Sequence, residues 1–324
     1  MRGSRLLVIV LLVLASMAGS VDLSGAAGFP EKPITLIVQS SAGGGSDLFA
    51  RTLAAIFEKE KLLPQPIVVE NKPGGSGAIA WSYILGKRGD PYFLCTAGPG
   101  MLTVPILRKT PYTFRDFTPI GNFAFDDFTV ITRSESRFKS IADLVREAKA
   151  NPRRITVGGT QVGSTDSIGA YLFEKAAGIQ FNFVSFTGGG EVNAALLGGH
   201  IDWAVANPGE AMELVKAKKV RALGVMTDKR LPSMPDVPTL REQGVDAIFR
   251  QHRALVAPGN LPAEARKVLD DAMLRYTRTA GFKKYMEDNT LSEGWMDGPT
   301  FGKFMEQESV KSVEILKGMG LLKK

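Results

Sequence analysis

Hydrophobic and polar positions follow two alternating patterns along this chain. Short apolar runs, typical of buried strands, precede longer stretches in which apolar side chains recur every three or four positions, as on one face of a helix. This alternation predicts an α/β fold with mostly parallel strands. The predicted strands span residues 34–38, 67–70, 92–96, 128–132, 155–157, 181–185, 201–206, 220–225 and 254–256. The predicted helices lie near 47–59, 78–85, 262–279, 282–288 and 300–319, and others begin near 140, 163, 188 and 207.

Two glycine-containing turns each separate a predicted strand from an amphipathic helix. The first spans residues 39–47 and ends in Ser46 and Asp47, and the second spans residues 158–166. Glycines let the backbone approach a ligand, and the first N–H groups of a helix lack internal partners and carry the positive end of its dipole. The first turn has neither a Walker A lysine nor a GxGxxG pattern, so a carboxylate fits it at least as well as a phosphate. We expect Ser46 or Asp47 to cap the helix, and a ligand-free connection is the alternative reading.

The two turns lie more than a hundred residues apart, in separate α/β stretches. In open α/β sheets, ligands bind outside the carboxyl ends of the strands, where such turns lie. If two domains face one another, both helix N-termini meet at a shared cleft. Each turn would then receive one carboxylate of a small diacid.

The N-terminal residues 1–26 are predicted to be a cleavable export signal. Arg2 and Arg5 form a positive region, residues 6–14 are apolar, and small residues suited to cleavage follow at 18–20 and 24–26. The apolar run is short for a membrane span, and a retained N-terminal anchor is the alternative. The mature protein is therefore expected outside the cytoplasm.

Composition excludes several classes of function. The formal charge is +7, but the basic residues are scattered, and the densest cluster, within residues 216–221, alternates with apolar positions, so we expect no nucleic-acid partner. Cys95 is the only cysteine, which rules out an intrachain disulfide, and it lies in an apolar run that predicts burial. His200 and His252 are too few for a zinc site. We expect no metal, no cofactor and no catalytic residues.

A series of short motifs, in a characteristic order and spacing, resembles one known family. It is similar to the solute-binding proteins of tripartite tricarboxylate transporters, the TctC or Bug family, over almost the whole mature chain. The motifs are Phe29-Pro30-Glu31-Lys32-Pro33-Ile34, Ala42-Gly43-Gly44-Gly45-Ser46-Asp47, Val69-Glu70-Asn71-Lys72-Pro73-Gly74-Gly75-Ser76-Gly77, Gly163-Ser164, Leu196-Leu197-Gly198-Gly199-His200-Ile201-Asp202, Asp236-Val237-Pro238-Thr239 and Ala257-Pro258.

The resemblance implies an exported, periplasmic or extracytoplasmic receptor with a two-domain, periplasmic-binding-protein-like fold of type II. Its ligand cleft would lie between the domains and hold a small organic anion, a di- or tricarboxylate. The expected domains are residues 27–127 with 251–324, and residues 128–228, with a crossover at 229–250. The resemblance also implies a membrane permease of one large and one small subunit as partner. We expect a monomer that is not an enzyme.

The resemblance and the turns together assign the candidate site. Two turns supply most of it, and the remaining residues follow later strands, where turn formation explains them equally well. Asp47 is either a ligand contact or only a helix cap. The predicted ligand-binding residues are Ser41, Ala42, Gly43, Gly44, Asp47, Gly163, Ser164, Thr187, Gly188 and Asn207.

Some positions depart from the family pattern and leave the ligand open. Thr187 stands where many members have a lysine, and Asp166 adds a negative charge beside the second turn unless it caps that helix. Arg253 or His252 could supply charge for a further carboxylate, and a surface or interdomain ion pair is the alternative. Two other functions compete: a receptor that signals to a membrane kinase, and an exported hydrolase with Ser46 or Ser164 as nucleophile.

Overall fold

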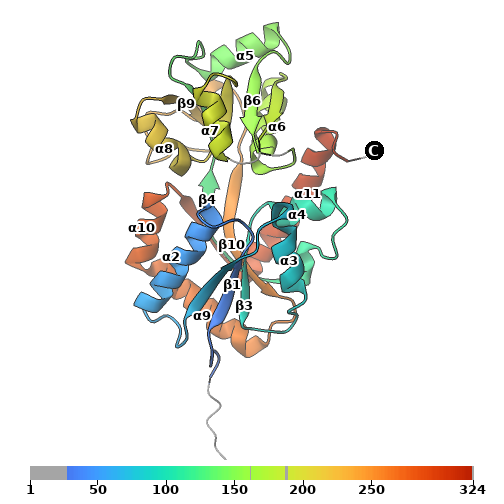
Figure 1. Cartoon of the computed structure of the whole chain (residues 1–324), viewed down its shortest axis with the longest axis vertical. Helices are drawn as coiled ribbons and strands as arrows, with labels where there is room; N and C mark the ends of the chain where they lie inside the picture. The colour runs from blue at the N-terminus through green and yellow to red at the C-terminus, as the bar shows by residue number, and fades with distance from the viewer. Residues whose placement is uncertain (1–27, 161, 187–188, 323–324) are drawn as a thin grey trace, which may run out of the picture.

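The computed structural model describes residues 28–322, apart from 161, 187 and 188. The predicted export signal and two predicted site residues, Thr187 and Gly188, therefore lie outside the described residues. The described part forms two lobes, each built around one β-sheet, and Figure 1 shows the small lobe above the large lobe. A fold of two α/β lobes is thereby confirmed.

The large lobe contains a six-stranded sheet in the order β11-β4-β10-β3-β1-β2. The small lobe contains a five-stranded sheet in the order β7-β6-β8-β5-β9. The strands of the large lobe are β1 (Ile34–Val38), β2 (Ile67–Asn71), β3 (Phe93–Ala97), β4 (Phe117–Asp127), β10 (Arg250–Pro258) and β11 (Ser292–Asp297). Those of the small lobe are β5 (Thr129–Arg133), β6 (Thr156–Gly159), β7 (Asn182–Ser185), β8 (Trp203–Ala206) and β9 (Val220–Val225).

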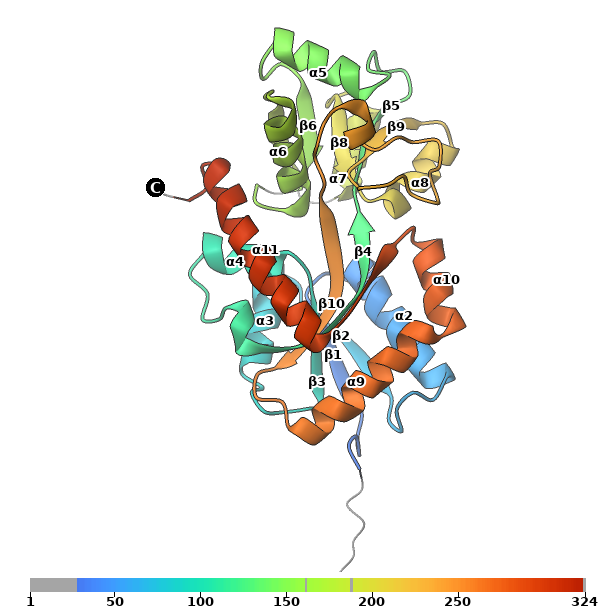
Figure 2. The same cartoon turned by 180° about the vertical axis from the view of Figure 1, so that it is seen from behind.

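Helices cover both faces of each sheet, because strand side chains alternate between the faces. In β1, Leu36 packs with α2, α9 and α10, whereas Ile37 packs with α3, α4 and α11 on the opposite face. Figure 2 shows these two groups on either side of the large sheet. In the small lobe, α5 and α6 cover one face, and α7 and α8 the other. The helices are α2 (Gly45–Lys59), α3 (Ala78–Leu85), α4 (Gly100–Leu107), α5 (Ile141–Ala150), α6 (Thr165–Ala177), α7 (Gly189–Leu197), α8 (Pro208–Lys216), α9 (Ala263–Arg278), α10 (Ala280–Asp288) and α11 (Gly298–Gly318).

Both sheets are mixed, so the prediction of mostly parallel strands needs correction. β1 pairs in parallel with β2 and β3, and β6 pairs in parallel with β7 and β8. However, β10 is antiparallel to both β3 and β4, and β5 is antiparallel to both β8 and β9. The cause is that the chain passes from one lobe to the other just before β5 and again just before β10. Each of these strands enters its sheet from the other lobe and therefore runs opposite to its neighbours.

Two chain segments pass between the lobes side by side. β4 ends at Asp127 in the large sheet and β5 begins at Thr129 in the small one, so the first crossing falls on Phe128. The second crossing enters β10 from Phe249, whose ring stacks on that of Phe128 with centroids 5.2 Å apart. Arg250 is aligned with Asp127 in the sheet. The two crossings therefore form one double connection.

The predicted crossover, residues 229–250, packs for most of its length against the small lobe. Leu231 and Met234 are buried beside Val225, and Leu240 and Val245 join the core under the small sheet. We therefore propose a small lobe of residues 128–249, with the crossing itself confined to the first residues of β10. No helix among the described residues is both long and apolar enough to span a membrane.

Candidate functional site

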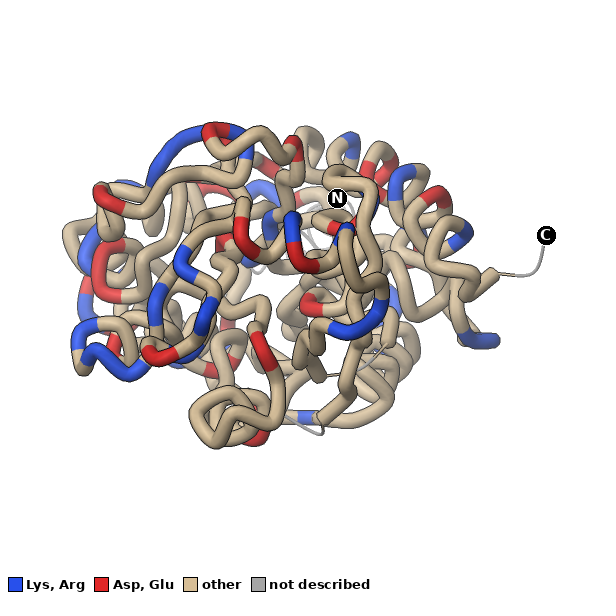
Figure 3. Tube along the Cα trace, turned by 90° about the horizontal axis from the view of Figure 1, so that it is seen from above, with Lys and Arg blue, Asp and Glu red and all other residues tan. Residues whose placement is uncertain are grey.

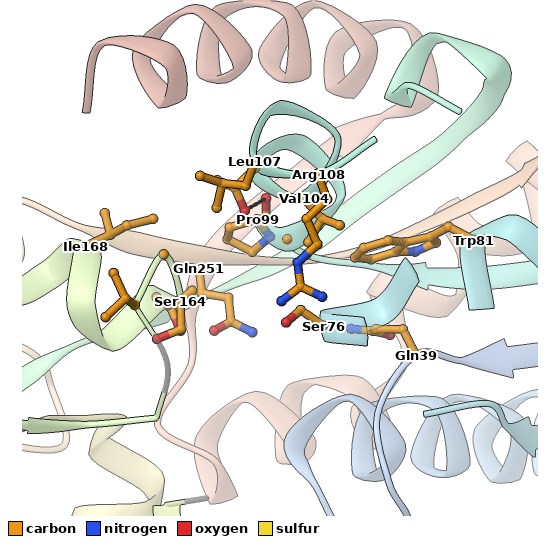
Figure 4. Close-up of a pocket in the computed structure, with 16 residues that line it drawn as sticks. Gln39, Ser76, Trp81, Pro99, Val104, Leu107, Arg108, Ser164, Ile168 and Gln251 are labelled. Atoms are coloured by element: carbon orange, nitrogen blue, oxygen red, sulfur yellow. Dashed lines mark hydrogen bonds between the residues drawn. The ribbon is translucent and has the colours of Figure 1, made fainter. Parts of the chain in front are cut away.

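Two of the cavities between the lobes together contain residues of both predicted turns. The Arg108 cavity has a volume of about 190 Å³ and is the one drawn in Figure 4. The Arg253 cavity has a volume of about 180 Å³. The Arg108 cavity is lined by the polar residues Gln39, Ser76, Thr103, Arg108, Ser164, Thr165 and Gln251, by Gly98, Gly100 and Gly163, and by apolar residues that include Trp81, Val104, Leu107 and Ile168. The Arg253 cavity is lined by Gly43, Gly45, Leu48, Asp126, Asn207, Gly209, Arg253, Tyr285, Asn289 and Leu291.

The Arg108 cavity joins elements that are distant in the sequence. Gln39 follows β1 and Ser76 precedes α3, both in the large lobe, whereas Gly163 and Ser164 precede α6 in the small lobe. Gln251 reaches the cavity from the crossing strand β10. A molecule in this space would therefore contact both lobes at once.

Arg108 is the one charged residue among the described residues that line this cavity. It follows α4 in extended conformation, with φ −136° and ψ 152°, and its side chain is exposed. Figure 4 shows its guanidinium turned toward Ser76 and Gln251. Within the described part of the chain it makes no hydrogen bond and no ion pair. Sequence reasoning missed Arg108 because it belongs to none of the motifs.

The first turn is held in shape by its own backbone donors. The Gly43 N–H donates to Asp47 Oδ2 at 2.9 Å, and the Gly44 N–H donates to the Ser41 carbonyl at 3.3 Å. The helix begins at Gly45 with Gly44 as N-cap, so the prediction that Ser46 or Asp47 is the cap is wrong. Asp47 is the third residue of the helix, and its side chain accepts the hydrogen bond from Gly43 in the preceding turn. The N-cap therefore lies at Gly44, two residues before Ser46.

Asp47 stabilises the first turn through the hydrogen bonds that its buried carboxylate accepts. The residue is only 3 % exposed. Arg51 Nε donates to Oδ2 at 3.0 Å, and Asn71 Nδ2 donates to Oδ1 at 2.9 Å. Burial by itself would raise the pKa of this carboxyl, but the hydrogen bonds from Arg51, Gly43 and Asn71 outweigh it, and the net pKa is lowered. We interpret Asp47 as a positioning residue.

The second turn is built in a similar way. Asp166 Oδ2 accepts from the Thr160 N–H at 2.8 Å and from the Thr160 hydroxyl at 2.9 Å, so its charge is engaged within the turn. The Gly163 N–H donates to Ser167 Oγ at 2.8 Å. Gly163 has φ +88°, and a Cβ there would lie 2.8 Å from Leu107 Cδ1. A glycine is needed because the turn is left-handed and the two lobes touch at this point.

In the Arg253 cavity, the guanidinium is neutralised by an acid. Arg253, 8 % exposed, forms an ion pair with Asp126 of the neighbouring strand β4. Its Nη1 also donates to Ser46 Oγ at 3.4 Å. A Cβ on Gly45 would lie 2.5 Å from Nη2, so the glycine leaves room for the arginine. This pair is buried within the large sheet, and it is neither superficial nor interdomain. Asn207 donates to the Asp127 carbonyl at 3.3 Å.

His252 points to the other face of β10. Its ring lies 5.6 Å from that of Phe301 and 5.8 Å from that of Phe304, and burial and the neighbouring Arg253 charge lower its pKa to about 4. It therefore stays neutral at physiological pH and supplies no charge to either cavity, which corrects that hypothesis.

The groups needed for hydrolysis do not meet at Ser46. Its hydroxyl accepts from Gln39 Nε2 at 3.0 Å and from Arg253, neither of which is a general base. Cys95 is buried as predicted, and burial raises the pKa of its thiol. In the described ranges, no three His, Cys, Asp or Glu residues cluster in a way that could hold a metal ion.

Four of the predicted site residues line one or other of the two cavities. Gly163 and Ser164 line the Arg108 cavity, and Gly43 and Asn207 line the Arg253 cavity. Ser41 and Ala42 are exposed in the first turn, and Gly44 is half-buried there. Gln39 connects the two spaces, because it lines the first and bonds to Ser46 beside Arg253. The ligand-binding roles of all these residues remain predictions.

Comparison with known proteins agrees with this architecture. Residues 49–321 match the family model described as the tripartite tricarboxylate transporter family receptor, TctC. The chain belongs to the TctC family. It is similar to a UPF0065 protein of the gbd 5' region of Cupriavidus necator, with 29 % identity over 298 residues, which covers 91 % of this chain and 90 % of that protein.

Solved structures of TctC relatives have the same fold. A TctC solute binding protein from Polaromonas, without ligand, is 28 % identical with a TM-score of 0.75, covering 89 % of this chain and 99 % of that one. The R. palustris protein Rpa4515 with adipate is 26 % identical with a TM-score of 0.81, covering 90 % of this chain and 98 % of that one. The family resemblance predicted from the motifs is thus confirmed.

Proposed function

We propose that this TctC protein is an extracytoplasmic receptor that captures a small organic carboxylate between its lobes and delivers it to a membrane transporter. The observation that carries the proposal is the Arg108 cavity, which a cation of the large lobe and the Gly163–Ser164 turn of the small lobe line together. Capture by charge and hydrogen bonds needs no nucleophile, base or metal. The ligand would bridge the lobes and stabilise the closed population.

The family supports the direction of this proposal. Adipate in Rpa4515 is a small dicarboxylate, and the family takes its name from a tripartite transporter. The partner would be a permease of one large and one small membrane subunit. A signalling role would use the same binding step, and uptake of labelled ligand by cells with and without this protein separates transport from signalling.

A thermal-shift screen tests ligand capture. The protein is first unfolded and refolded to remove bound ligand, and is then heated with mono-, di- and tricarboxylates and their amides. Ligand at a hundred times its Kd adds about 2.7 kcal/mol of stability. For a chain of this size, that raises the melting temperature by about 5 °C. The absence of any shift with every small anion would contradict the proposal.

A further inference from the structure

We propose that the Arg108 cavity selects a singly charged ligand: a short carboxylic acid whose far end is a neutral hydrogen-bonding group such as a primary amide. This inference rests on the proposed function and narrows its substrate class. It departs from the di- or tricarboxylate expected from the family resemblance.

The first support is the balance of charge in the cleft. Arg108 is the one charged residue among the described residues lining its cavity, and it has no acidic partner among them. Arg253, in the second cavity, is already neutralised by Asp126. The three internal positions outside the described residues are glutamine, threonine and glycine, so the sequence places no further charge there. One carboxylate can therefore form an ion pair in the Arg108 cavity, and a second one finds no further cation among the described residues that line it.

The second support is the pair of side-chain amides, of Gln39 and Gln251, that line the same cavity as Arg108. Gln39 and Gln251 converge on Gly98, where an ideal Cβ would lie 3.9 Å from Nε2 of each. Gln39 is held in place because its Nε2 donates to Ser46 and its Oε1 accepts from Thr96. The Gln251 side chain makes no hydrogen bond within the described part, so both its donor and its acceptor are open to a ligand.

These amides favour a neutral partner over a second carboxylate. A primary amide both donates and accepts, and can satisfy a glutamine side chain in both directions, whereas a carboxylate only accepts. A carboxylate that enters the cavity must also lose its water, and hydrogen-bond donors without a cation compensate that loss less well than an ion pair does. The guanidinium of Arg108 offers a planar fork that suits a single carboxylate.

Matched ligands that differ in one charge test the inference directly. Succinate, glutarate and adipate are compared with their monoamides, succinamate, glutaramate and adipamate, by calorimetric titration of the refolded protein at neutral pH. Members of each pair have nearly the same shape. We expect at least one monoamide to bind about tenfold or more tightly than its diacid.

If every diacid binds as tightly as its monoamide, or more tightly, the inference is overturned and the proposed function still stands. Binding of other anions in the thermal-shift screen, with no binding of any monoamide, would do the same. Failure of every anion in both experiments would instead remove the proposed function itself.

Variants of residues at the cavity provide a second, independent test of the inference. Arg108→Gln should weaken monoamide binding at least tenfold and abolish its salt dependence, with the melting temperature of the free protein nearly unchanged because Arg108 is exposed and unpaired. Lys109→Gln is the matched control, since Lys109 is the adjacent exposed cation and does not line the cavity. Gln251→Lys adds a second cation and should shift preference toward the diacid. Wild-type affinity in Arg108→Gln would contradict the assignment.

Discussion

Asp47 and Asp166 occupy corresponding places beside the two turns of the cleft. Each lies within the first three residues of a helix and accepts a backbone N–H from earlier in its turn, Gly43 for Asp47 and Thr160 for Asp166. A negative charge there is favourable because it meets the positive end of the helix dipole. At the residue scale, the acids therefore shape the turns, and the cation that faces a ligand comes from Arg108.

The substitution Asp47→Asn tests this bracing role. An amide has one acceptor oxygen, so it cannot keep the bonds from Gly43, Arg51 and Asn71 together, and we expect a loss of about 1–3 kcal/mol of unfolding free energy at pH 7. The lowered pKa means that the wild-type contribution is present above the ordinary carboxyl pKa and is lost as pH falls through the folded value. Urea unfolding should show a smaller difference at pH 3 than at pH 7.

A matched control for this variant is Asp236→Asn, because Asp236 is exposed and makes no hydrogen bond or ion pair among the described residues. It should unfold like the wild type at both pH values. Equal stability of Asp47→Asn and wild type at pH 7 would show that the turn does not depend on the carboxylate.

His252 gives a prediction that depends on pH. Its pKa is lowered from 6.5 to about 4 by burial and by Arg253, so the unfolded chain binds a proton at a pH where the folded chain does not. Its contribution to stability is complete above about pH 6.5 and declines as pH falls toward 4. In an NMR titration of the two histidine rings, the His252 signal should stay constant down to about pH 5. A midpoint near 6.5 would contradict its burial.

At the scale of elements, α6 offers an internal comparison because a left-handed glycine lies at each end. Gly163 has φ +88° and abuts Leu107, whereas Gly178 has φ +64° and no atom within 4 Å of its Cβ position. Alanine at either site should cost about 1–2 kcal/mol of stability from the backbone alone. Only Gly163→Ala should also weaken ligand binding, because it pushes the small-lobe turn away from α4. Unfolding curves and titrations of both variants separate the two effects.

Elements with regular apolar patterns were predictable, and those with interruptions were not. The strands β1 and β9 have the predicted bounds, and the Ser140–Asp143 capping box before α5 is present. β4 was missed because Pro119 and Gly121 interrupt its apolar pattern and the strand ends in two aspartates. β11 was missed as well, as was α4, which contains Pro105. β10 is longer than predicted because its first residues are charged or polar, although they are paired across the sheet.

The candidate site was predictable only as far as its backbone turns. Glycine motifs locate the turns, but sequence cannot show which N–H groups the turn itself consumes, as at Gly43 and Gly163. Nor does it show that Arg253 meets Asp126, because strand register decides that contact. Arg108 lies outside the motifs, and only the packing of the end of α4 against the small-lobe turn at Gly163 brings it to the cavity.

At the scale of the whole molecule, charge contributes little to long-range recognition. Basic and acidic positions are interspersed along the chain in the view of Figure 3. This distribution agrees with a small ligand bound inside a cleft. The property that matters at this scale is the closeness of the lobes, which meet at Gly163 beside Leu107 and at Gly209 beside Asn289.

A larger side chain placed where the lobes meet should therefore weaken ligand binding, even though it lies outside the Arg108 cavity. Gly209 is the second residue of α8, and a Cβ there would lie 3.0 Å from the Asn289 carbonyl at the end of α10. Gly209→Val cannot be accommodated without separating these backbones, so the closed population falls, and the apparent affinity falls by the same factor. We expect about a tenfold loss of ligand affinity in a calorimetric titration, and a larger radius of gyration by solution scattering with ligand present.

Gly190→Val is the matched control, because Gly190 is the second residue of α7 and has open space at its Cβ. Equal affinity of the two variants would mean that capture does not require the lobes to approach at α8.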